Sequence, residues 1–137
     1  MMLAAPATIL TGIVTLLAVL ISLAFAIQVG RTRQAVRIDA PAMTGHPDLE
    51  RALRIQGNTV EMIVIFLPSL WLAALYFQGW APPIIGLVWC LGRILYAVSY
   101  GTHKQRFPGF ALTVIPSLIL VVLAAIGLVG AWGASTA

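Results

Sequence analysis

Ionisable and amide side chains recur at helical spacing in the stretch Arg51-Ala52-Leu53-Arg54-Ile55-Gln56-Gly57-Asn58-Thr59-Val60-Glu61. Successive spacings of three, four and three residues would place four of them on one face of a helix, namely Arg51, Arg54, Asn58 and Glu61. An apolar run from Met62 to Tyr76 follows directly. Polar groups at the entrance of a membrane helix are costly unless they are paired or line a wet cavity, so this stripe predicts a functional site. The alternative is a set of interhelical hydrogen bonds that only holds a bundle together.

A second polar stripe lies in a later apolar segment and consists of Arg93, Tyr96 and Tyr100. Spacings of three and four residues again favour one helical face. The tyrosines alone would suit the aromatic belt at a membrane interface, but Arg93 lies deep in the segment and needs a partner. Glu61 is the only acidic residue inside any apolar segment, so we predict an ion pair between Arg93 and Glu61.

The composition is that of a membrane protein. Of 137 residues, 61% are hydrophobic and 9% are charged, against about 25% charged residues in soluble domains. Segments 7–29, 52–77, 84–100 and 110–132 are each long enough to cross a bilayer core, which takes roughly 20 residues. We therefore expect an all-α integral membrane protein, a four-transmembrane-helix bundle that forms a single domain over residues 1–137.

The cations predict the orientation of this bundle. Every Lys and Arg except Arg93 lies in or beside the first loop, about 30–50, or the third loop, about 101–109. The positive-inside rule then puts both loops and both polar stripes on the cytoplasmic side and the two termini outside. The net charge of +4 is thus a matter of topology rather than a sign of nucleic-acid binding. The sequence shows no metal-ligand cluster, glycine-rich phosphate loop or nucleophilic triad.

The polar side chains suit a small anionic ligand together with a lipophilic one. Guanidinium groups match carboxylates in a two-pronged geometry, and Glu61 could meet an ammonium group of the same ligand. A cationic pocket also stabilises a thiolate, whereas a free thiol, with a pKa of about 8.5, is mostly protonated at neutral pH. An apolar groove would admit a second substrate from the bilayer. A tripeptide thiol that attacks a lipophilic electrophile fits this set.

The motifs of this chain resemble those of the MAPEG family, the membrane-associated proteins in eicosanoid and glutathione metabolism. The resemblance covers most of the chain and implies a bacterial-type member. Its most specific elements are the runs Arg54-x-Gln56-x-Asn58-x-x-Glu61 and Arg93-x-x-Tyr96-x-x-x-Tyr100. The others are Gln28-Val29 with Arg33 and Arg37, Gly45, Glu50-Arg51, Phe66-Leu67-Pro68, and Arg106 near Gly109-Phe110.

The resemblance implies a homotrimer in a bacterial inner membrane that binds glutathione, its co-substrate, between neighbouring subunits. The implied activity is conjugation of the glutathione thiolate to lipophilic electrophiles in detoxification, with peroxidase activity toward lipid hydroperoxides beside it. Gln56 is rotated about 200° around the helix from Arg54, so it would face a different wall of an intersubunit site. The implied glutathione contacts are Arg33, Arg54, Gln56, Asn58, Glu61, Tyr96 and Tyr100, with Arg106 stabilising the thiolate and Arg93 bracing the pocket.

Three positions depart from the pattern of the leukotriene C4 synthases in this family. Met62 and Gln34 replace a tyrosine and an arginine. Phe107 stands where a thiol-activating arginine is expected, and Arg106 is one residue early. These departures favour an alternative, a non-catalytic membrane protein that binds lipid or glutathione or acts as a scaffold. A further alternative is a small proton-coupled exporter that uses Glu61, although the surrounding arginines would repel a cationic substrate.

Overall fold

The computed structural model describes residues 5–100 and 103–136, and for residues 103–106 the backbone alone. The described chain forms four α-helices and one short π-helix: α1 (Pro6–Val36), α2 (Pro47–Leu72), η1 (Ala73–Phe77), α3 (Ala81–Val98) and α4 (His103–Thr136). Within the described residues, four helical segments are long and apolar enough to cross a membrane, with η1 continuing α2. The expected all-α four-helix membrane bundle is confirmed. The third helix ends at Val98 rather than at residue 100.

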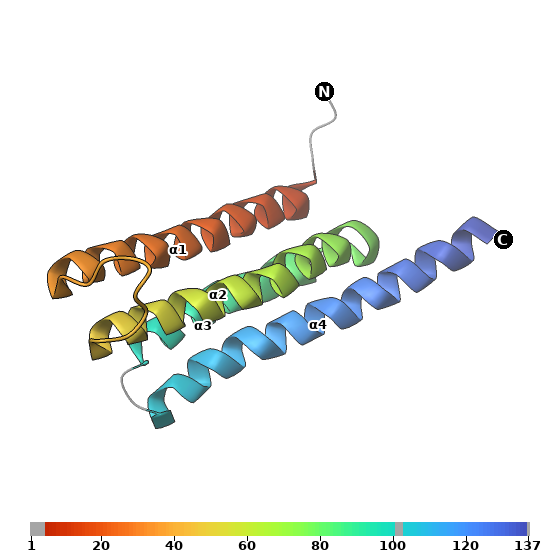
Figure 1. The fold of residues 1–137 in the computed structure, drawn as a ribbon. Helices are drawn as coiled ribbons and strands as arrows, with labels where there is room; N and C mark the ends of the chain where they lie inside the picture. Colours follow the sequence, from red (N-terminus) through yellow and green to blue (C-terminus); the bar gives the residue numbers. More distant parts are fainter. Residues whose placement is uncertain (1–4, 101–102, 137) are drawn as a thin grey trace.

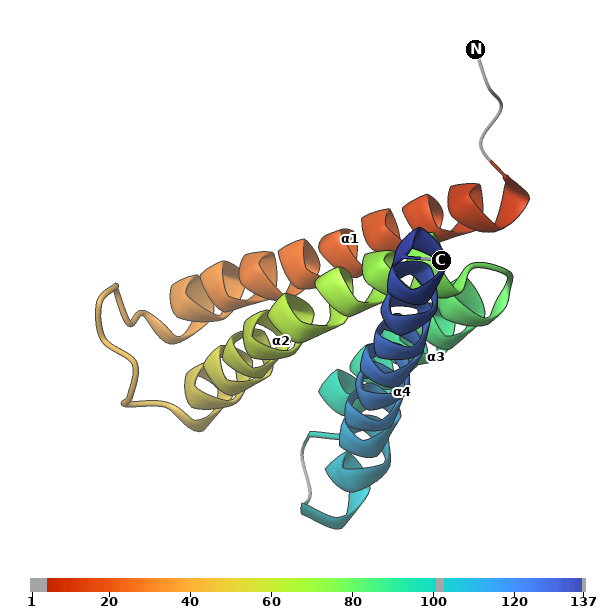
Figure 2. The same cartoon turned by 90° about the vertical axis from the view of Figure 1, so that its right-hand side faces the viewer.

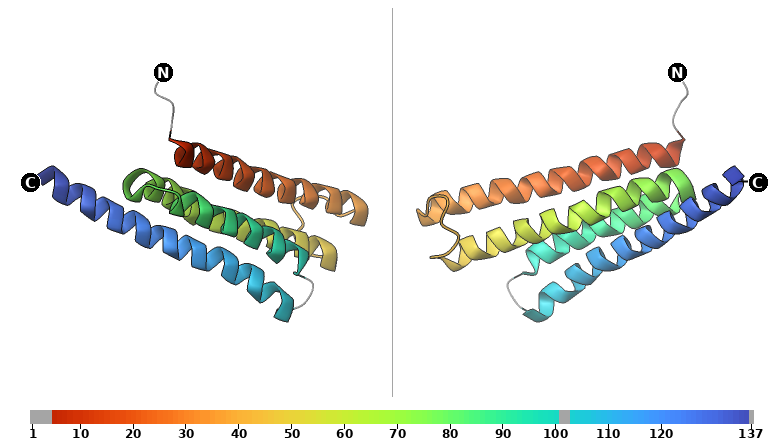
Figure 3. Two further views of the ribbon diagram at one scale, coloured as in Figure 1. Left: turned by 180° about the vertical axis from the view of Figure 1, so that it is seen from behind. Right: turned by 45° about the vertical axis from the view of Figure 1, so that its right-hand side comes forward.

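The helices lie side by side and run alternately in opposite directions (Figure 1). The start of α1 and the end of α4 lie at one end of the bundle, and the α1–α2 loop lies at the other (Figures 2 and 3). The end of α3 lies near this loop. α4 extends past the other helices toward the C-terminus. The end of α3 thus lies at the same end of the bundle as the α1–α2 loop and the charged residues of α2.

The start of α2 follows from its local sequence. His46 has an extended conformation, and its Nδ1 accepts a hydrogen bond from the Asp48 N–H at 3.2 Å. Pro47 suits the first helical position because its fixed φ is helical and its missing N–H would have had no partner there. Asp48 and Glu50 put negative charge into the first turn, where the helix dipole favours it. This start places the polar stripe of α2 in the first turns of the helix, at the loop end of the bundle.

The core lies where side chains of all four helices meet. Phe66 of α2 stacks on Trp89 of α3, with ring centroids 4.1 Å apart and planes 3° from parallel. The other buried members of this cluster are Val14, Ala18, Ile21, Met62, Leu70, Ala73, Cys90, Leu120 and Ala124. On the outside, large apolar side chains such as Leu16, Val64 and Leu91 are more than half exposed. Lipid tails are as apolar as these side chains, so this surface suits a bilayer.

α3 and α4 approach each other closely at Gly92. A Cβ atom on this glycine would overlap the main chain and the side chain of Leu112. In an uninterrupted helix the Leu112 carbonyl would accept from the N–H four residues later, but Pro116 has no N–H. The main chains of α3 and α4 therefore meet at the Leu112 carbonyl, which has no N–H donor at position 116 of its own helix. Small residues allow such close contacts between membrane helices.

Gly92→Ala is expected to lower the stability of the detergent-solubilised protein by about 1–3 kcal/mol, because the added methyl group overpacks this contact. A thermal or denaturant melt followed by circular dichroism measures the change. Gly12→Ala in α1 is the matched control, since no atom of another helix lies within 4 Å of its added Cβ. The control should be unchanged or slightly more stable, given the helix propensity of alanine. Equal melts for the two variants would contradict the assigned contact.

Candidate functional site

A cavity of about 550 Å³ opens between α2, the end of α3 and the α1–α2 loop. It brings the two polar stripes of the sequence together, although they are more than thirty residues apart along the chain. Its lining consists of Met43, Thr44, Glu50, Leu53, Arg54, Gly57, Asn58, Glu61, Tyr96 and Tyr100. The sequence-based candidates among these are Arg54, Asn58, Glu61, Tyr96 and Tyr100.

α2 presents opposite charges at two levels of this cavity. Arg54 and Glu61 are about two helical turns apart, a rise of about 10 Å along the helix axis. Both side chains are exposed on the cavity wall, and neither forms an ion pair with another described residue. A guanidinium and a carboxylate at this separation match a ligand that carries a carboxylate at one end and an ammonium group at the other.

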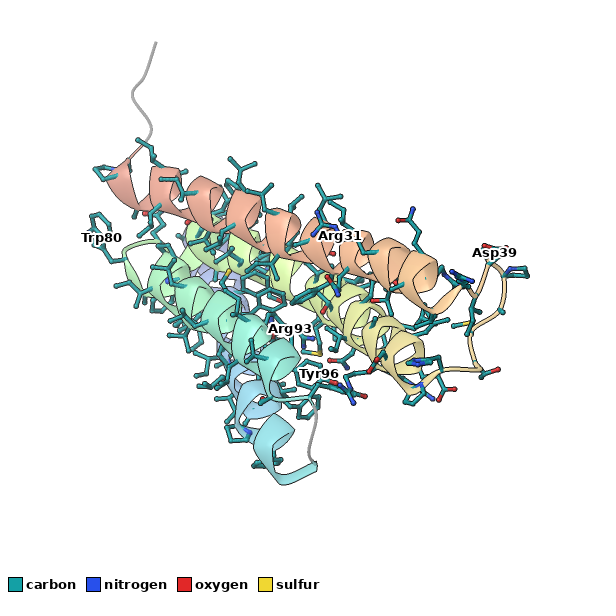
Figure 4. The ribbon with its side chains drawn as sticks, turned by 90° about the vertical axis from the view of Figure 1, so that its left-hand side faces the viewer. Arg31, Asp39, Trp80, Arg93 and Tyr96 are labelled. Atoms are coloured by element: carbon teal, nitrogen blue, oxygen red, sulfur yellow. The ribbon has the colours of Figure 1, made fainter. Side chains whose placement is uncertain are left out.

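Arg93 is the buried charge beside this cavity. Its side chain has no exposed surface. Nη1 donates to Asn58 Oδ1 and Nη2 donates to Thr59 Oγ1, each over 2.9 Å. Its guanidinium carbon lies 4.4 Å from the centroid of the Tyr96 ring, which is a cation–π contact. Arg93 therefore supports two cavity residues, one on each helix, and Figure 4 shows Arg93 and Tyr96 together on α3.

The predicted ion pair between Arg93 and Glu61 is not formed within the chain, and this expectation is corrected. Among the described residues, the carboxylate that lies within ion-pair distance of an arginine is that of Asp48, 3.8 Å from Arg51. Glu61 instead lies exposed on the cavity wall. The physical reason is register, because the α2 side chains that reach Arg93 come two and three residues before Glu61 and supply neutral oxygens. The carboxylate is therefore left exposed in the cavity.

The contact with Arg93 decides which end of the Asn58 amide faces the cavity. Arginine carries only donors, so Oδ1 must turn toward it and Nδ2 must turn away. Among the described residues, the buried polar side-chain atoms without a hydrogen-bond partner are Trp89 Nε1 and Arg93 Nε. Asn58 Nδ2 is not one of them and makes no hydrogen bond to another described residue, and Asn58 lines the cavity, so this donor is open to it. The site thus offers a hydrogen-bond donor to a carboxylate, a carbonyl or a thiolate.

The two tyrosines form the wall that faces α2. Tyr96 is 7% exposed, and its ring meets that of Tyr100 edge to face, with centroids 5.3 Å apart and planes at 80°. Gly109 of α4 packs so closely on the main chain of Tyr96 that a Cβ atom there would overlap it. The first turns of α4 therefore lie beside the tyrosine wall.

Arg33 holds the α1–α2 loop and does not line the cavity. Its Nη1 donates to the carbonyl oxygen of Ala42 at 2.6 Å and to that of Ile38 at 3.4 Å. These bonds fix the loop just before Met43 and Thr44, which form the loop side of the cavity. Within one chain, Arg33 acts on the site through the loop.

Three other residues that were expected at the site are not among the described residues that line this cavity. Gln56 does not line the cavity, in keeping with its rotation of about 200° from Arg54. Arg51 was expected on the α2 stripe but lines a second cavity, because it is rotated by about 60° from Arg54; Glu50 lines the first cavity instead. Arg106 belongs to the first turn of α4, and its side chain lies outside the described residues.

Two of the departures from the family pattern lie outside the cavity lining. Met62 is 9% exposed and packs into the core cluster of the bundle. Phe107 is 67% exposed and is not among the cavity residues. Neither side chain therefore takes the place of a polar group on the wall of this cavity within one chain.

Sequence reasoning missed Thr59, which is fully buried and accepts from Arg93. It also missed the loop residues Met43 and Thr44. A signal for the first was present, since an arginine deep in a membrane helix needs acceptors and a threonine adjoins the predicted amide. The loop residues carry no such signal, because their place depends on how the loop folds back.

The region that holds every cavity residue also matches a known family. A family model described as the MAPEG family covers residues 11–126. The chain belongs to the MAPEG family. The resemblance inferred from the polar motifs of α2 and α3 is therefore confirmed, and with it the membrane-protein class of this MAPEG chain.

Curated relatives of this MAPEG chain cover most of its length. It is 46% identical over 112 residues to an uncharacterized protein of Synechocystis sp., which covers 81% of this chain and 82% of that protein. It is 40% identical over 105 residues to microsomal glutathione S-transferase 2 of Homo sapiens, with 76% and 71% covered. It is 38% identical over 116 residues to leukotriene C4 synthase of Bos taurus, with 84% and 77% covered.

Proposed function

We propose that this protein is a glutathione-dependent membrane transferase, which joins the glutathione thiolate to lipophilic electrophiles and also reduces lipid hydroperoxides. The observation that carries the proposal is that one cavity collects polar groups from both stripes, namely Arg54, Asn58, Glu61, Tyr96 and Tyr100. The relatives named as a glutathione S-transferase and a leukotriene C4 synthase support the same class of reaction.

In this proposal each cavity group has a role that follows from its chemistry. Arg54 binds a carboxylate of glutathione, and Glu61 binds its ammonium group about two helical turns deeper. Asn58 donates through Nδ2 to an oxygen or sulfur acceptor of the tripeptide. Tyr96 and Tyr100 line the facing wall with aromatic rings and hydroxyl groups. Arg106 stabilises the thiolate.

The reaction itself needs the thiol without its proton. The sulfur of the thiolate attacks an electrophilic carbon, a carbon–sulfur bond forms, and the leaving group departs with its electron pair or a strained ring opens. A cation near the sulfur lowers the free energy of the thiolate relative to the thiol, so more of the reactive form is present at neutral pH. A lipophilic acceptor reaches the cavity from the bilayer around the exposed apolar faces of the helices.

We also propose a homotrimer in a bacterial inner membrane, with the cavity end in the cytoplasm and both termini outside. The basic residues at the cavity end support this orientation through the positive-inside rule. The placement of Gln56 outside the cavity of its own chain supports a role at the cavity of a neighbouring chain. Native mass spectrometry of the detergent-solubilised protein should give the mass of three chains; a monomer that binds glutathione would contradict the trimer.

Glutathione binding by the purified protein, followed by conjugation to a generic aryl halide, tests the proposed function. The expected result is binding accompanied by the ultraviolet absorption of the thiolate and by product formation. Binding without a thiolate signal would favour the non-catalytic alternative. Absence of binding would overturn the site assignment.

Arg106→Ala is expected to lower turnover by about tenfold or more and to change glutathione affinity by less than about threefold. The reason is that a cation beside the sulfur acts on the thiolate rather than on the ends of the tripeptide. Stopped-flow measurement of the thiolate absorption separates the two effects. Arg37→Ala removes a cation that lines neither cavity and serves as the control. Unchanged turnover in Arg106→Ala would assign thiol activation to another residue.

A further inference from the structure

A second cavity, of about 590 Å³, opens on a different side of α2 from the first. The α2 residues that line it are rotated by roughly 140° from those that line the first cavity, at about 100° per residue. α1 and α3 form its other walls, and Figure 4 looks onto these two helices with α2 between and behind them. Its lining consists of Phe25, Gln28, Arg31, Thr32, Ala35, Val36, Asp48, Arg51, Ala52, Ile55, Ala97 and Val98.

The polar part of this cavity has an excess of positive charge. Arg31 of α1 and Arg51 of α2 contribute guanidinium groups from two helices. The only carboxylate in the lining belongs to Asp48, which lies 3.8 Å from Arg51. Arg31 forms no ion pair with a described residue. One cation is therefore left without a carboxylate, and Gln28 and Thr32 add neutral hydrogen-bonding groups to the same wall.

The rest of the lining is apolar and extends toward the membrane. Phe25 lies six residues before Arg31 on α1, a distance of about 9 Å along the helix axis. Ile55 of α2 and Val98 of α3 form the facing walls, and Val98 is 81% exposed. The two cations thus lie nearer the loop end of the bundle than the apolar Phe25 and Ile55, while Ala35 and Val36 add apolar surface at the loop end. An amphiphile with a negative head and a hydrocarbon tail shows a matching change from charged to apolar along its length.

We propose that this second cavity binds an anionic phospholipid of the surrounding membrane, with its phosphate between Arg31 and Arg51 and one acyl chain over Phe25 and Val98. Guanidinium groups bind phosphate oxygens in a two-pronged geometry. The ammonium of a zwitterionic headgroup would bring a further positive charge near the two arginines, so a lipid with a net negative charge is favoured. The bound lipid would connect α1 to α2 and α3 beside the α1–α2 loop. This site is separate from the glutathione cavity and does not depend on the proposed function.

Lipid binding is tested on the full-length protein in detergent by native mass spectrometry. Dioleoylphosphatidylglycerol and dioleoylphosphatidylcholine are added in equal amounts, and the lipid adducts are counted. The wild type is expected to retain phosphatidylglycerol in preference. Arg31→Gln should reduce this preference about fivefold, and the double variant Arg31→Gln/Arg51→Gln should abolish it. Arg37→Gln makes the same charge change outside both cavities and should retain the preference.

The apolar part of the cavity is tested with Ala97→Phe, which narrows it without a change of charge. This variant should lose phosphatidylglycerol adducts. It should still form adducts with added glycerol phosphate, because Arg31 and Arg51 are unchanged. Equal loss of preference in Arg31→Gln and Arg37→Gln would overturn the proposal in favour of a general basic surface. If the wild type retained phosphatidylcholine as well as phosphatidylglycerol, the proposal would be overturned, because the cavity would then bind acyl chains whatever the charge of the headgroup. Glutathione binding, measured in every variant, should be unchanged and separates this result from the proposed function.

Discussion

Asn58→Asp is expected to weaken glutathione binding by about 100-fold while the melting temperature stays the same or rises. The aspartate keeps an oxygen toward Arg93, where the hydrogen bond becomes charge-assisted at both ends. Its second oxygen takes the place of Nδ2, so the cavity loses a donor and gains a negative charge. A like charge next to a ligand carboxylate or thiolate costs several kcal/mol, and each 1.4 kcal/mol corresponds to tenfold in affinity. Isothermal titration with glutathione and a thermal melt on the same sample measure both effects.

The control for this prediction is Thr44→Asp, which adds a negative charge on the loop side of the cavity and leaves the Asn58 donor in place. A loss of less than about tenfold is expected in the control, because a charge at an exposed position is screened by water and salt. Comparable losses in the two variants would show that general charge repulsion, and not the orientation of the amide, determines binding.

Arg93→Met is expected to lower both stability and glutathione affinity. Without the guanidinium, Asn58 Oδ1 and Thr59 Oγ1 lose the donor they share, although Thr59 Oγ1 still donates to the Ile55 carbonyl oxygen at 2.7 Å, so we expect a loss of about 1–3 kcal/mol in all. The amide of Asn58 is then free to rotate, and the Tyr96 ring loses its cation. We expect the melting temperature to fall clearly and the affinity for glutathione to fall at least about tenfold. A denaturant melt and a binding titration in detergent measure the two losses.

Thr59→Val separates the structural part of this effect from the part that concerns binding. Valine has nearly the shape of threonine and removes one acceptor of Arg93, but Thr59 does not line the cavity. The variant should therefore lose stability, with an affinity within about twofold of the wild type. If affinity fell in proportion to stability in both variants, Arg93 would have only a structural role, and its effect on the Asn58 amide would be excluded.

The polar stripes could be predicted from the sequence because helical spacing is a local property. Residues three and four apart share a face of a helix whatever surrounds it, and so Arg54, Asn58 and Glu61 do line one cavity. The same holds for Tyr96 and Tyr100 in the second stripe. The four-helix class was equally local, since the length and apolarity of each segment decide whether it can cross a membrane.

The partners of these side chains could not be predicted, because they depend on how one helix is placed against another. A shift of α2 by less than one turn along α3 decides whether Arg93 meets Glu61 or meets Asn58 and Thr59. Rotation of α2 about its own axis assigns Arg51 to one cavity and Arg54 to another. Such offsets arise from the packing of the whole bundle.

The sequence by itself therefore determined the class of the protein, the number of its spans and the residues that carry charge into the membrane. The tertiary structure decided which of those charges are satisfied inside the protein and which remain exposed on the cavity wall. Arg93 is satisfied by neutral oxygens of α2, and Glu61 is left on the cavity wall. The physical reason is that a hydrogen bond requires donor and acceptor within about 3 Å, a distance that only the packed helices define.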